Sequence, residues 1–223
     1  MSSPQASSRP AATVILTRES TSSDVGFDIL MLRRSEVGAF AGNWVFPGGR
    51  VDDADAGHDD ESRARSAAVR EAAEEVSAEV DPRSMIAWSH WTPPESAPAR
   101  FTTWFFVAPW RGDDVRIDNH EIVEHRWMSP RAALDARLLM APPTIVTLHE
   151  LIETGSHDGL YRGRATIPSY VTRVTRDSDG TMVLLWSGDA GYDSSDPHAD
   201  GPRHRLVSPG GFNTTDWYFV RTI

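Results

Sequence analysis

The sequence predicts an α/β domain that carries a β-rich C-terminal extension. Over residues 11–154, short runs rich in β-branched, aromatic and other apolar residues alternate with segments whose apolar residues recur at helical spacing. Past about residue 155 only short β-rich runs follow, and Gly, Asp, Ser and Pro separate them. We therefore expect a flexible tail over residues 1–10, an α/β domain over 11–154, and an extension over 155–223 that packs on this domain.

The first elements predict a hairpin and then a glycine turn. Residues 11–16 and 27–32 are β-rich, and the polar segment between them contains Ser, Asp and Gly, which is typical of a hairpin connection. A short strand over 44–46 then leads into a Pro-Gly-Gly sequence. Gly48 and Gly49 are expected to let the backbone turn tightly and approach a ligand closely, because glycine adopts positive φ without steric cost.

A helix that carries three carboxylates follows, over residues 67–80. At 3.6 residues per turn, one side of it is apolar and is expected to face the core. The members of this apolar stripe are Val69, Ala72, Ala73, Val76 and Val80. Glu71, Glu74 and Glu75 fall on the opposite side, where like charges destabilise a helix by a few tenths of a kcal/mol per pair, whereas a cation such as Mg²⁺ is held by carboxylate oxygens. This pattern indicates either a solvated acidic face or a metal site.

The remaining elements of the α/β domain are predicted in the same way. Strands are expected over 84–91, 101–110 and 119–128, and helices over 131–139 and 144–153. The tryptophans of these strands are expected to lie in the core rather than against a nucleotide base, because aromatic residues in strands are mostly buried.

The composition excludes several classes of function. The formal net charge of −10 argues against nucleic acid as the main partner, because that binding depends on clustered Lys and Arg. The chain has no lysine, which excludes a lysine nucleophile, and no cysteine, which excludes thiol catalysis and disulfides and fits a cytoplasmic protein. No run of about eighteen apolar residues occurs, so no membrane span is predicted.

These features together resemble the Nudix hydrolases. The family signature has a glycine, an acid six residues later, and then Arg-Glu-U-x-Glu-Glu, where U is apolar. Here it reads Gly49, Asp55 and, after fourteen residues, Arg70-Glu71-Ala72-Ala73-Glu74-Glu75. The resemblance covers roughly residues 11–150. It implies the Nudix α/β/α sandwich around a mixed β-sheet, and hydrolysis of a diphosphate linked to another moiety.

The sequence departs from the signature at three points. Asp55 stands where the family has Glu, and the loop between this acid and the helix is seven residues longer than usual. Ser77 replaces the glycine that normally closes the motif. These departures leave the role of Asp55 open and predict a helix that continues to Val80 and stops at Asp81, since a residue before proline is pushed out of helical geometry.

The resemblance implies Mg²⁺ or Mn²⁺ as cofactor, with Glu71 and Glu75 as the first metal ligands and Glu74 as the next. Arg70 is expected to orient one of these carboxylates. The catalytic base varies among family members, and Glu71, Glu74 and Glu124 are the candidates for activating water.

Further site residues are also inferred from the resemblance. An acidic turn before the strand over 119–128 resembles a second Nudix hallmark, and Glu124 is preferred over Glu121 as the acid that it supplies. The residues expected to bind substrate are Arg33, Arg34, Gly48, Gly49 and Arg100. Residues 202–205 form a basic cluster that is either a phosphate grip or a surface patch.

The substrate is predicted only as a class, a small nucleotide diphosphate. The segment from Met31 to Gly49 resembles the coenzyme A diphosphatase branch, and the long loop and the Pro142-Pro143 helix entry resemble its acyl-coenzyme A members. The alternative is an ADP-ribose, sugar-nucleotide or dinucleotide pyrophosphatase. An alternative of a different class is a non-catalytic Nudix-fold binding or regulatory module. A homodimer is compatible with the sequence.

Overall fold

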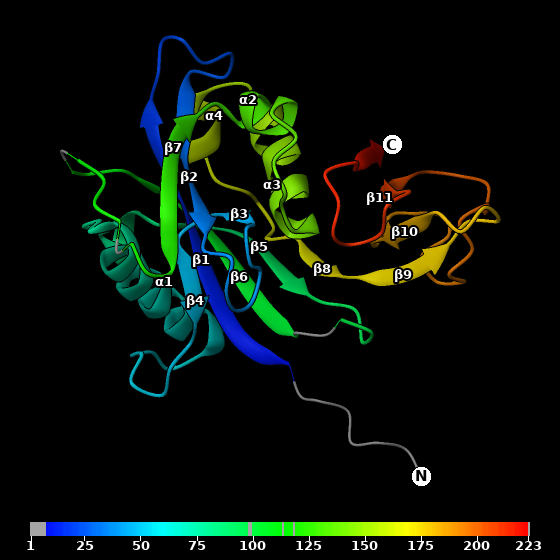
Figure 1. The fold of residues 1–223 in the computed structure, drawn as a ribbon, viewed down its shortest axis with the longest axis horizontal. Coiled ribbons are helices and arrows are strands. Elements are labelled where there is room, and N and C mark those ends of the chain that lie inside the picture. Colours follow the sequence, from blue (N-terminus) through cyan, green and yellow to red (C-terminus); the bar gives the residue numbers. More distant parts are fainter. Residues whose placement is uncertain (1–7, 98–99, 113, 118, 223) are drawn as a thin grey trace.

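The computed structural model describes residues 8–97, 100–112, 114–117 and 119–222. Its main sheet consists of β1 (Arg9–Glu19), β2 (Phe27–Arg34), β3 (Trp44–Val45), β4 (Gly48–Arg50), β5 (Ile86–Thr92), β6 (Phe101–Pro109), β7 (Ile122–Met128) and β8 (Ser169–Val171). The strand order is β3-β2-β1-β6-β5-β8, with β4 paired to β1 and β7 paired to β2 (Figure 1). The sheet is mixed, because β1 pairs with β6 and β5 with β8 in parallel while the other pairs are antiparallel.

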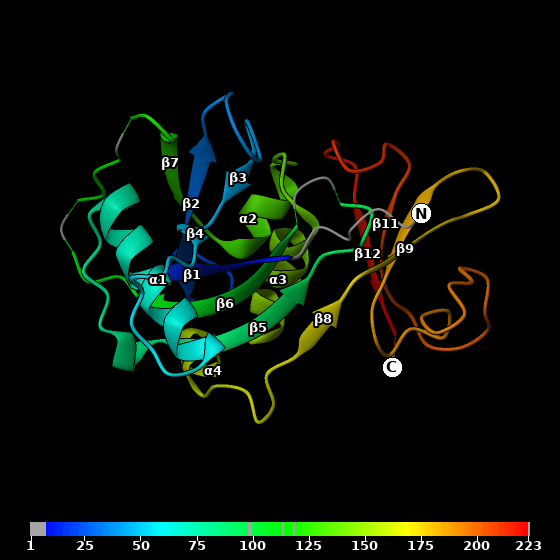
Figure 2. The same cartoon turned by 90° about the horizontal axis from the view of Figure 1, so that it is seen from below.

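Helices cover both faces of this sheet, which confirms the predicted α/β/α sandwich. The helices are α1 (Asp60–Val76), α2 (Pro130–Asp135), α3 (Pro142–Glu153) and α4 (His157–Tyr161), with a 3₁₀ turn over Pro82–Ser84. Helix α1 packs on one face, and α2 and α3 lie on the other (Figure 2). Strand β1 is apolar almost throughout because neighbours cover both of its faces. Val14 and Leu16 face α1, whereas Ile15 faces α3. Within the described ranges, no helix has the length and apolar character needed to cross a membrane.

The predicted hairpin opens toward the glycine segment. Strands β1 and β2 pair only near their connection, from Thr17↔Ile29 to Glu19↔Phe27. Beyond that point β4 pairs with the first half of β1 and β3 pairs with the end of β2. The chain that follows β2 therefore lies where β1 and β2 diverge, and it brings Gly48 and Gly49 under α1.

Helix α1 begins and ends earlier than the sequence predicts. Asp59 caps its N-terminus by accepting the N–H of Ser62 at 2.8 Å, and the acids of the first turn favour the helix dipole. The predicted continuation to Val80 is wrong, because Ser77 adopts a left-handed conformation with φ 55° and ψ 33°. The N–H groups of Ser77 and Ala78 then bond to the last carbonyls of the helix. Ser77 thus occupies the glycine position of the motif in the glycine conformation.

Replacing Ser77 with Gly is expected to stabilise the protein by about 1 kcal/mol, because a residue with a Cβ is strained in this conformation and glycine is not. Denaturant unfolding of the wild type and the variant measures the difference. An unchanged or lower free energy of unfolding would contradict this explanation of the helix end.

Other boundaries also differ from the predictions. Strand β1 begins at Arg9, inside the predicted tail, of which residues 1–7 lie outside the described residues. Helix α2 ends at Asp135 instead of residue 139, and Arg137 beyond it has a φ of 47° that no helix continues through. Helix α4 was not predicted. Trp88 and Trp91 lie in the core, as expected, and are each 2% exposed.

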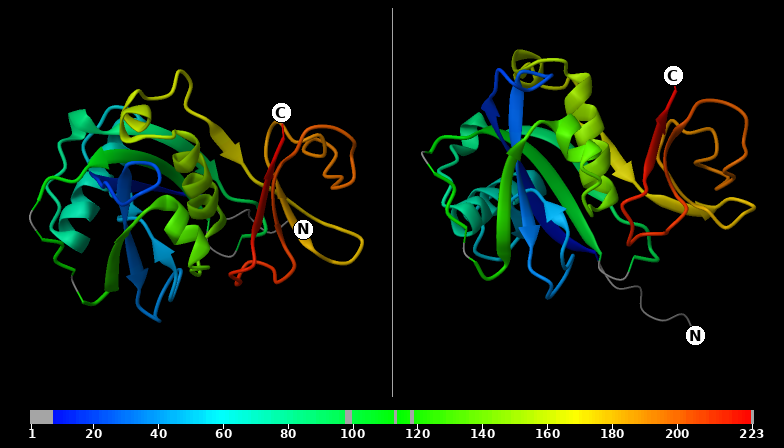
Figure 3. Two further views of the ribbon diagram at one scale, coloured as in Figure 1. Left: turned by 90° about the horizontal axis from the view of Figure 1, so that it is seen from above. Right: turned by 45° about the horizontal axis from the view of Figure 1, so that its top comes forward.

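Strands from the C-terminal extension form a second sheet beside α3 (Figure 3). It contains β9 (Arg173–Arg176), β10 (Met182–Leu185), β11 (His204–Ser208) and β12 (Tyr218–Arg221), all antiparallel in the order β12-β11-β10-β9. Met182, Leu184 and Trp186 belong to the same buried cluster as Ile145 and Leu148 of α3. The boundary expected between residues 154 and 155 stays a prediction. Strand β8, which lies after it, belongs to the main sheet.

Candidate active site

The carboxylate of Glu75 reaches from α1 to the backbone of β4. The residue is 5% exposed, and the N–H of Gly48 donates to its Oε2 at 2.9 Å. Gly48 pairs with Thr13 of β1, and a Cβ at Gly48 would lie 2.3 Å from the carbonyl oxygen of Ala12. Glycine is therefore required here by the closeness of two strands. The tight turn predicted at this position is wrong, because Gly48–Arg50 form β4.

Glu71, one helical turn before Glu75, lies against the next residue of β4. A Cβ at Gly49 would be 2.4 Å from Oε1 of Glu71, so the absence of a side chain at Gly49 makes room for this carboxylate. The two neighbouring glycines thus accommodate the two carboxylates. The prediction that all three glutamates face away from the core is wrong for Glu75, which is buried, whereas the Glu74 side chain is 59% exposed.

Both carboxylates at the glycines are held in surroundings that disfavour their charge. Burial raises the pKa of Glu75 to about 8, and the nearby charge of Glu71 adds to this effect, although the hydrogen bond from Gly48 opposes it. Burial also raises the pKa of Glu71, against the opposing effect of Arg70. A positive charge placed between Glu71 and Glu75 would remove this electrostatic cost.

The metal-free protein is expected to lose stability as the pH rises, and Glu75 is the cause. Its pKa in the folded state, about 8, lies above its ordinary value of 4.5, so between these values the folded state holds a proton that the unfolded chain has lost. The free energy of unfolding therefore falls as the pH rises through this window. The variant Glu75→Gln removes the titration. It should match the wild type near about pH 5 and be more stable than it at about pH 8. An equal difference at both pH values, measured by thermal unfolding in a chelating buffer, would contradict the assignment.

Arg70 connects this pair to the loop before the helix. Its Nη1 donates to Glu71 Oε1 at 2.7 Å and to Glu74 Oε2 at 3.2 Å. Its Nε and Nη2 each donate to one carboxylate oxygen of Asp55 at 3.1 Å. Burial tends to raise the pKa of Asp55, but the bonds from Arg70 and from the N–H of Asp52 outweigh it, so this pKa is lowered. Asp55, whose role the sequence left open, is an anchor for Arg70.

Removing this anchor is expected to lower activity without unfolding the protein. In Asp55→Ala, Arg70 loses its fork partner and Glu71 loses its fixed orientation, so kcat/KM should fall by about 10- to 100-fold, the usual effect of losing a residue that orients a metal ligand. The matched control is Asp53→Ala in the same loop. The Asp53 side chain is fully exposed, and its ion pair with Arg63 is long, at 3.9 Å. Equal activity of the two variants would refute the positioning role.

Arg34 of β2 lies on the α1 side of the sheet, beside the buried carboxylate. Its Nη1 is 3.8 Å from Glu75 Oε1, and its Nη2 donates to Glu121 Oε2 at 2.9 Å. Its Nε is buried and, among the described residues, has no hydrogen-bond partner. Such an orphaned donor beside a carboxylate pair suits an anionic ligand.

Arg33 and Glu124 do not join this cluster. Adjacent residues of a strand project to opposite faces, so Arg33 lies on the other side of the sheet from Arg34. Arg33 pairs with Glu36 at 2.6 Å, and Glu124 pairs with Arg126 at 2.6 Å. The guanidinium of Arg126 in turn lies over the ring of Trp44. Arg33 and Glu124 therefore lie together on the sheet face opposite α1, and their functional roles stay predictions.

The acid that the start of β7 brings to the carboxylate pair is Glu121. Its charge contributes to the raised pKa of both Glu71 and Glu75. The sequence analysis favours Glu124 instead. Which acid lies near Glu71 and Glu75 depends on the register between β2 and β7, in which Arg34 is opposite Ile122, and this register cannot be read from the sequence. Arg100, immediately before β6, is half-buried, and its carbonyl accepts the N–H of Arg9 at 2.9 Å. Its part in substrate binding stays a prediction.

The basic cluster in the extension has a structural task. Arg205 is 7% exposed, and its Nε and Nη2 donate to the two carboxylate oxygens of Asp189 at 2.7 and 2.6 Å. Its Nη1 donates to the carbonyl of Pro197. Arg203 donates to the carbonyl of Ala199. Both arginines hold the loop between β10 and β11, so the phosphate-grip interpretation of this cluster is not supported.

The donor set at the glycines consists of two carboxylates. In the part of the chain that the structure describes, no three acidic or imidazole side chains come together as a closed metal site. A hard cation such as Mg²⁺ needs no such trio, because proteins bind it through one or two carboxylates while water and substrate phosphates fill the other positions. Glu71 and Glu75 are the candidate pair.

Comparison with known proteins identifies the family. A family model described as the NUDIX domain matches residues 7–150. No curated protein matches the sequence. A solved NUDIX hydrolase from Alicyclobacillus acidocaldarius is 21% identical, with 73% of this chain and 97% of that chain covered and a TM-score of 0.62. The NUDIX domain of Shewanella oneidensis NrtR, solved in complex with ADP ribose, is 14% identical, with 68% and 92% covered and a TM-score of 0.53.

At these identities the structural likeness shows the fold, and the family model carries the assignment. Members of this family generally need divalent metal ions and act on small nucleotide-diphosphate substrates. The match over residues 7–150, on the sandwich and the carboxylate-bearing helix described above, shows that the chain belongs to the Nudix family and is a hydrolase of pyrophosphate bonds.

Proposed function

We propose that this protein hydrolyses the phosphoanhydride bond of a nucleoside diphosphate linked to another moiety, with Mg²⁺ or Mn²⁺ held by Glu71 and Glu75. The observation that carries the proposal is the placement of these two carboxylates, one turn apart on α1, at the side-chain-free backbone of Gly48 and Gly49. Two neighbouring carboxylates whose pKa values are both raised are costly without a cation and favourable with one.

The chemistry requires neutralised phosphoryl oxygens and a positioned, deprotonated water. When bound, a divalent cation held by Glu71 and Glu75 would supply Lewis acidity and lower the pKa of water. The N–H of Gly48 fixes Glu75, and Arg70 fixes Glu71. Arg34 offers its unpartnered Nε to a phosphoryl oxygen.

Glu74 can accept the proton of the attacking water, because its side chain is 59% exposed beside the metal ligands. Arg70 occupies only one of its two oxygens. Glu124, the other base candidate outside the ligand pair, pairs with Arg126 on the opposite face of the sheet. A pH–rate profile of Glu74→Gln that loses its acidic limb, beside an unchanged profile of Glu124→Gln, would identify Glu74 as the base.

For the moiety joined to the diphosphate, we propose coenzyme A or an acyl-coenzyme A. The support is the resemblance of the segment from Met31 to Gly49 and of the Pro142-Pro143 helix entry to that branch of the family. The second candidate is ADP-ribose or a sugar nucleotide, which the ADP ribose complex of the Shewanella oneidensis NUDIX domain favours.

Product analysis on a small substrate panel separates these candidates. The panel holds coenzyme A, an acyl-coenzyme A, ADP-ribose, NADH, a UDP-sugar and a nucleoside triphosphate, each with Mg²⁺ and with Mn²⁺. Release of 3′,5′-ADP from the coenzyme A species alone supports the first proposal. Cleavage of ADP-ribose or a sugar nucleotide alone keeps the metal site and overturns the substrate. Absence of turnover together with tight binding of a panel member would favour a non-catalytic binding module.

A further inference from the structure

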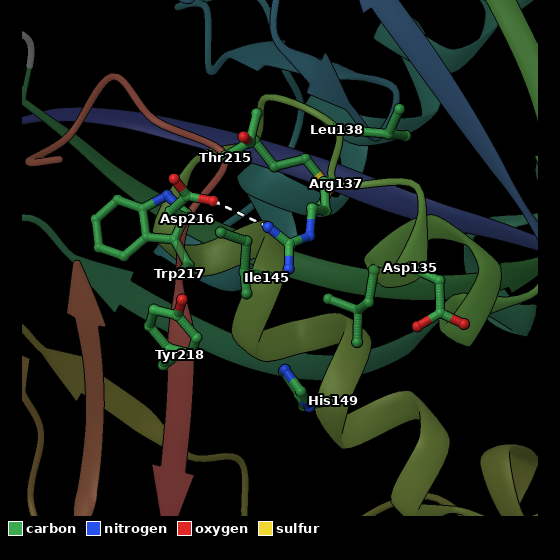
Figure 4. A pocket seen from close by; sticks show the side chains of 11 residues that line it. Asp135, Arg137, Leu138, Ile145, His149, Thr215, Asp216, Trp217 and Tyr218 are labelled. Atoms are coloured by element: carbon green, nitrogen blue, oxygen red, sulfur yellow. Dashed lines mark hydrogen bonds and ion pairs between the residues drawn. The ribbon is translucent and has the colours of Figure 1, made fainter. Parts of the chain in front are cut away.

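A cavity of about 450 Å³ lies between the α2–α3 region and the segment that leads into β12 (Figure 4). Leu134, Leu138 and Ile145 line it from the α/β domain, and Trp217 lines it from the extension. Polar groups stand among these apolar side chains, with His149 on α3 and Thr215 opposite. A volume of this size lies within the range of small-molecule sites, and the lining combines apolar and polar side chains in similar measure.

Contacts on several sides fix the two walls relative to each other. Arg137 donates to Asp216 at 3.2 Å across the cavity, and Arg221 donates to Glu153 at 3.0 Å. The rings of His149 and Phe219 lie 4.9 Å apart between these ion pairs. The cavity therefore exists before a ligand arrives, and a ligand would not have to order its walls.

The charges of the lining decide which ligands fit. Asp135 and Asp216 contribute two carboxylates against the single guanidinium of Arg137, which Asp216 already occupies. Burial lowers the pKa of His149, and Arg131 nearby lowers it further, so this imidazole is neutral at physiological pH. Among the described residues that line the cavity, no cation lacks an acidic partner, and a phosphate or carboxylate would meet net negative charge. An uncharged group with both apolar and polar parts is favoured instead.

The cavity shares a wall with the strand that leads to the active site. Leu139 lies between two lining residues, and its carbonyl accepts the N–H of Trp44 in β3 at 2.8 Å. Gly48 lies four positions after Trp44, so their Cα atoms are at most about 14 Å apart. A short stretch of chain therefore joins the cavity wall to Gly48 and Gly49.

We infer that the cavity between α2–α3 and β12 binds an uncharged arm of the substrate with both apolar and polar parts, the part joined to the diphosphate on the side away from the nucleoside. This inference rests on the proposed function for its link to the active site, but binding to the cavity can be measured without hydrolysis. It assigns the C-terminal extension a task in substrate recognition.

The test uses the full-length protein and S-octanoyl-pantetheine, an uncharged probe that carries no phosphate. Calorimetric titration should show binding to the wild type. The variant Leu138→Trp, which fills the cavity from a half-buried position, should bind about tenfold more weakly. Trp217→Ala, which removes the opposite wall, should also weaken binding. The control Val171→Trp adds the same indole at a position that is 47% exposed and outside the cavity, and it should bind like the wild type.

Two further comparisons sharpen the result. A succinyl-pantetheine probe, which adds a carboxylate, should bind more weakly than the octanoyl probe, because the lining is net negative. With octanoyl-coenzyme A as substrate, Leu138→Trp should raise KM and leave kcat unchanged, whereas Val171→Trp should leave both as in the wild type.

The outcomes separate the inference from the proposed function. Cavity-dependent binding of the probe without any coenzyme A turnover would keep the inference and remove the proposed substrate. Coenzyme A turnover with probe affinity and KM unaffected by Leu138→Trp and Trp217→Ala would overturn the inference alone. Absence of probe binding to the wild type would also overturn it.

Discussion

The variant Glu75→Gln is expected to retain the fold and to lose nearly all hydrolysis. Glutamine has the same shape and its side-chain oxygen can still accept the N–H of Gly48, so packing beneath β4 is preserved. It lacks the charge that would hold a divalent cation, whose stabilisation of phosphoryl oxygens amounts to several kcal/mol. At about 1.4 kcal/mol per factor of ten, kcat/KM should fall by about 10³-fold or more.

The measurement is kcat/KM at saturating Mg²⁺ or Mn²⁺ on the substrate that the panel identifies, with circular dichroism as the check on folding. The matched control is Glu79→Gln, an exposed acid just beyond the end of α1. It should keep full activity. Full activity of a folded Glu75→Gln would refute the metal assignment.

The variant Glu150→Ala is expected to cause the largest loss of stability. Glu150, on α3, is 3% exposed and accepts hydrogen bonds from Trp88 Nε1 at 3.0 Å and from the hydroxyl of Tyr170. Arg164 forms an ion pair with it at 3.1 Å and stacks over the ring of Trp88. Removing the carboxylate leaves buried donors and a charge without their partner, which typically costs about 3–5 kcal/mol.

Chemical denaturation gives this difference directly. The control is Glu153→Ala, one turn later on the same helix, where an exposed carboxylate pairs with Arg221. The free energy of unfolding of Glu153→Ala should fall by less than about 1 kcal/mol, as is usual for surface ion pairs. Similar losses for the two variants would show that the Glu150 cluster does not join α3 to β5 and β8 as described.

The sequence predicts the identity of the elements well, because their apolar patterns are local. The β-rich runs on either side of α1 identify the sandwich, and the Arg70-to-Glu75 pattern identifies the helix that carries the carboxylates. Of the predicted apolar stripe, Ala72 and Val76 are buried on α1, whereas the inclusion of Ala73 is wrong because this residue is exposed. Where the sequence failed, the cause was non-local. Glu75 is buried because β4 passes beneath it. Gly48 is needed because β1 lies directly alongside.

The sequence also does not reveal which side chains that are distant along the chain pair with each other. Asp55 reaches Arg70 across a loop of unusual length, and Glu121 reaches the site through the register of β7 on β2. Neither follows from spacing along the chain. The helix end at Ser77 was missed because a serine seldom adopts a left-handed conformation. The sequence predicts a phosphate grip or a surface patch around Arg205, because its partner Asp189 is sixteen residues away.

Titration of the metal-free protein with Mn²⁺ tests the central claim most directly, because it requires no knowledge of the substrate. Calorimetry on the wild type should show a bound ion, and Glu71→Gln and Glu75→Gln should each bind it at least about tenfold more weakly. Glu79→Gln should match the wild type. Equal Mn²⁺ affinity in all four proteins would contradict the assignment of Glu71 and Glu75 as the metal site.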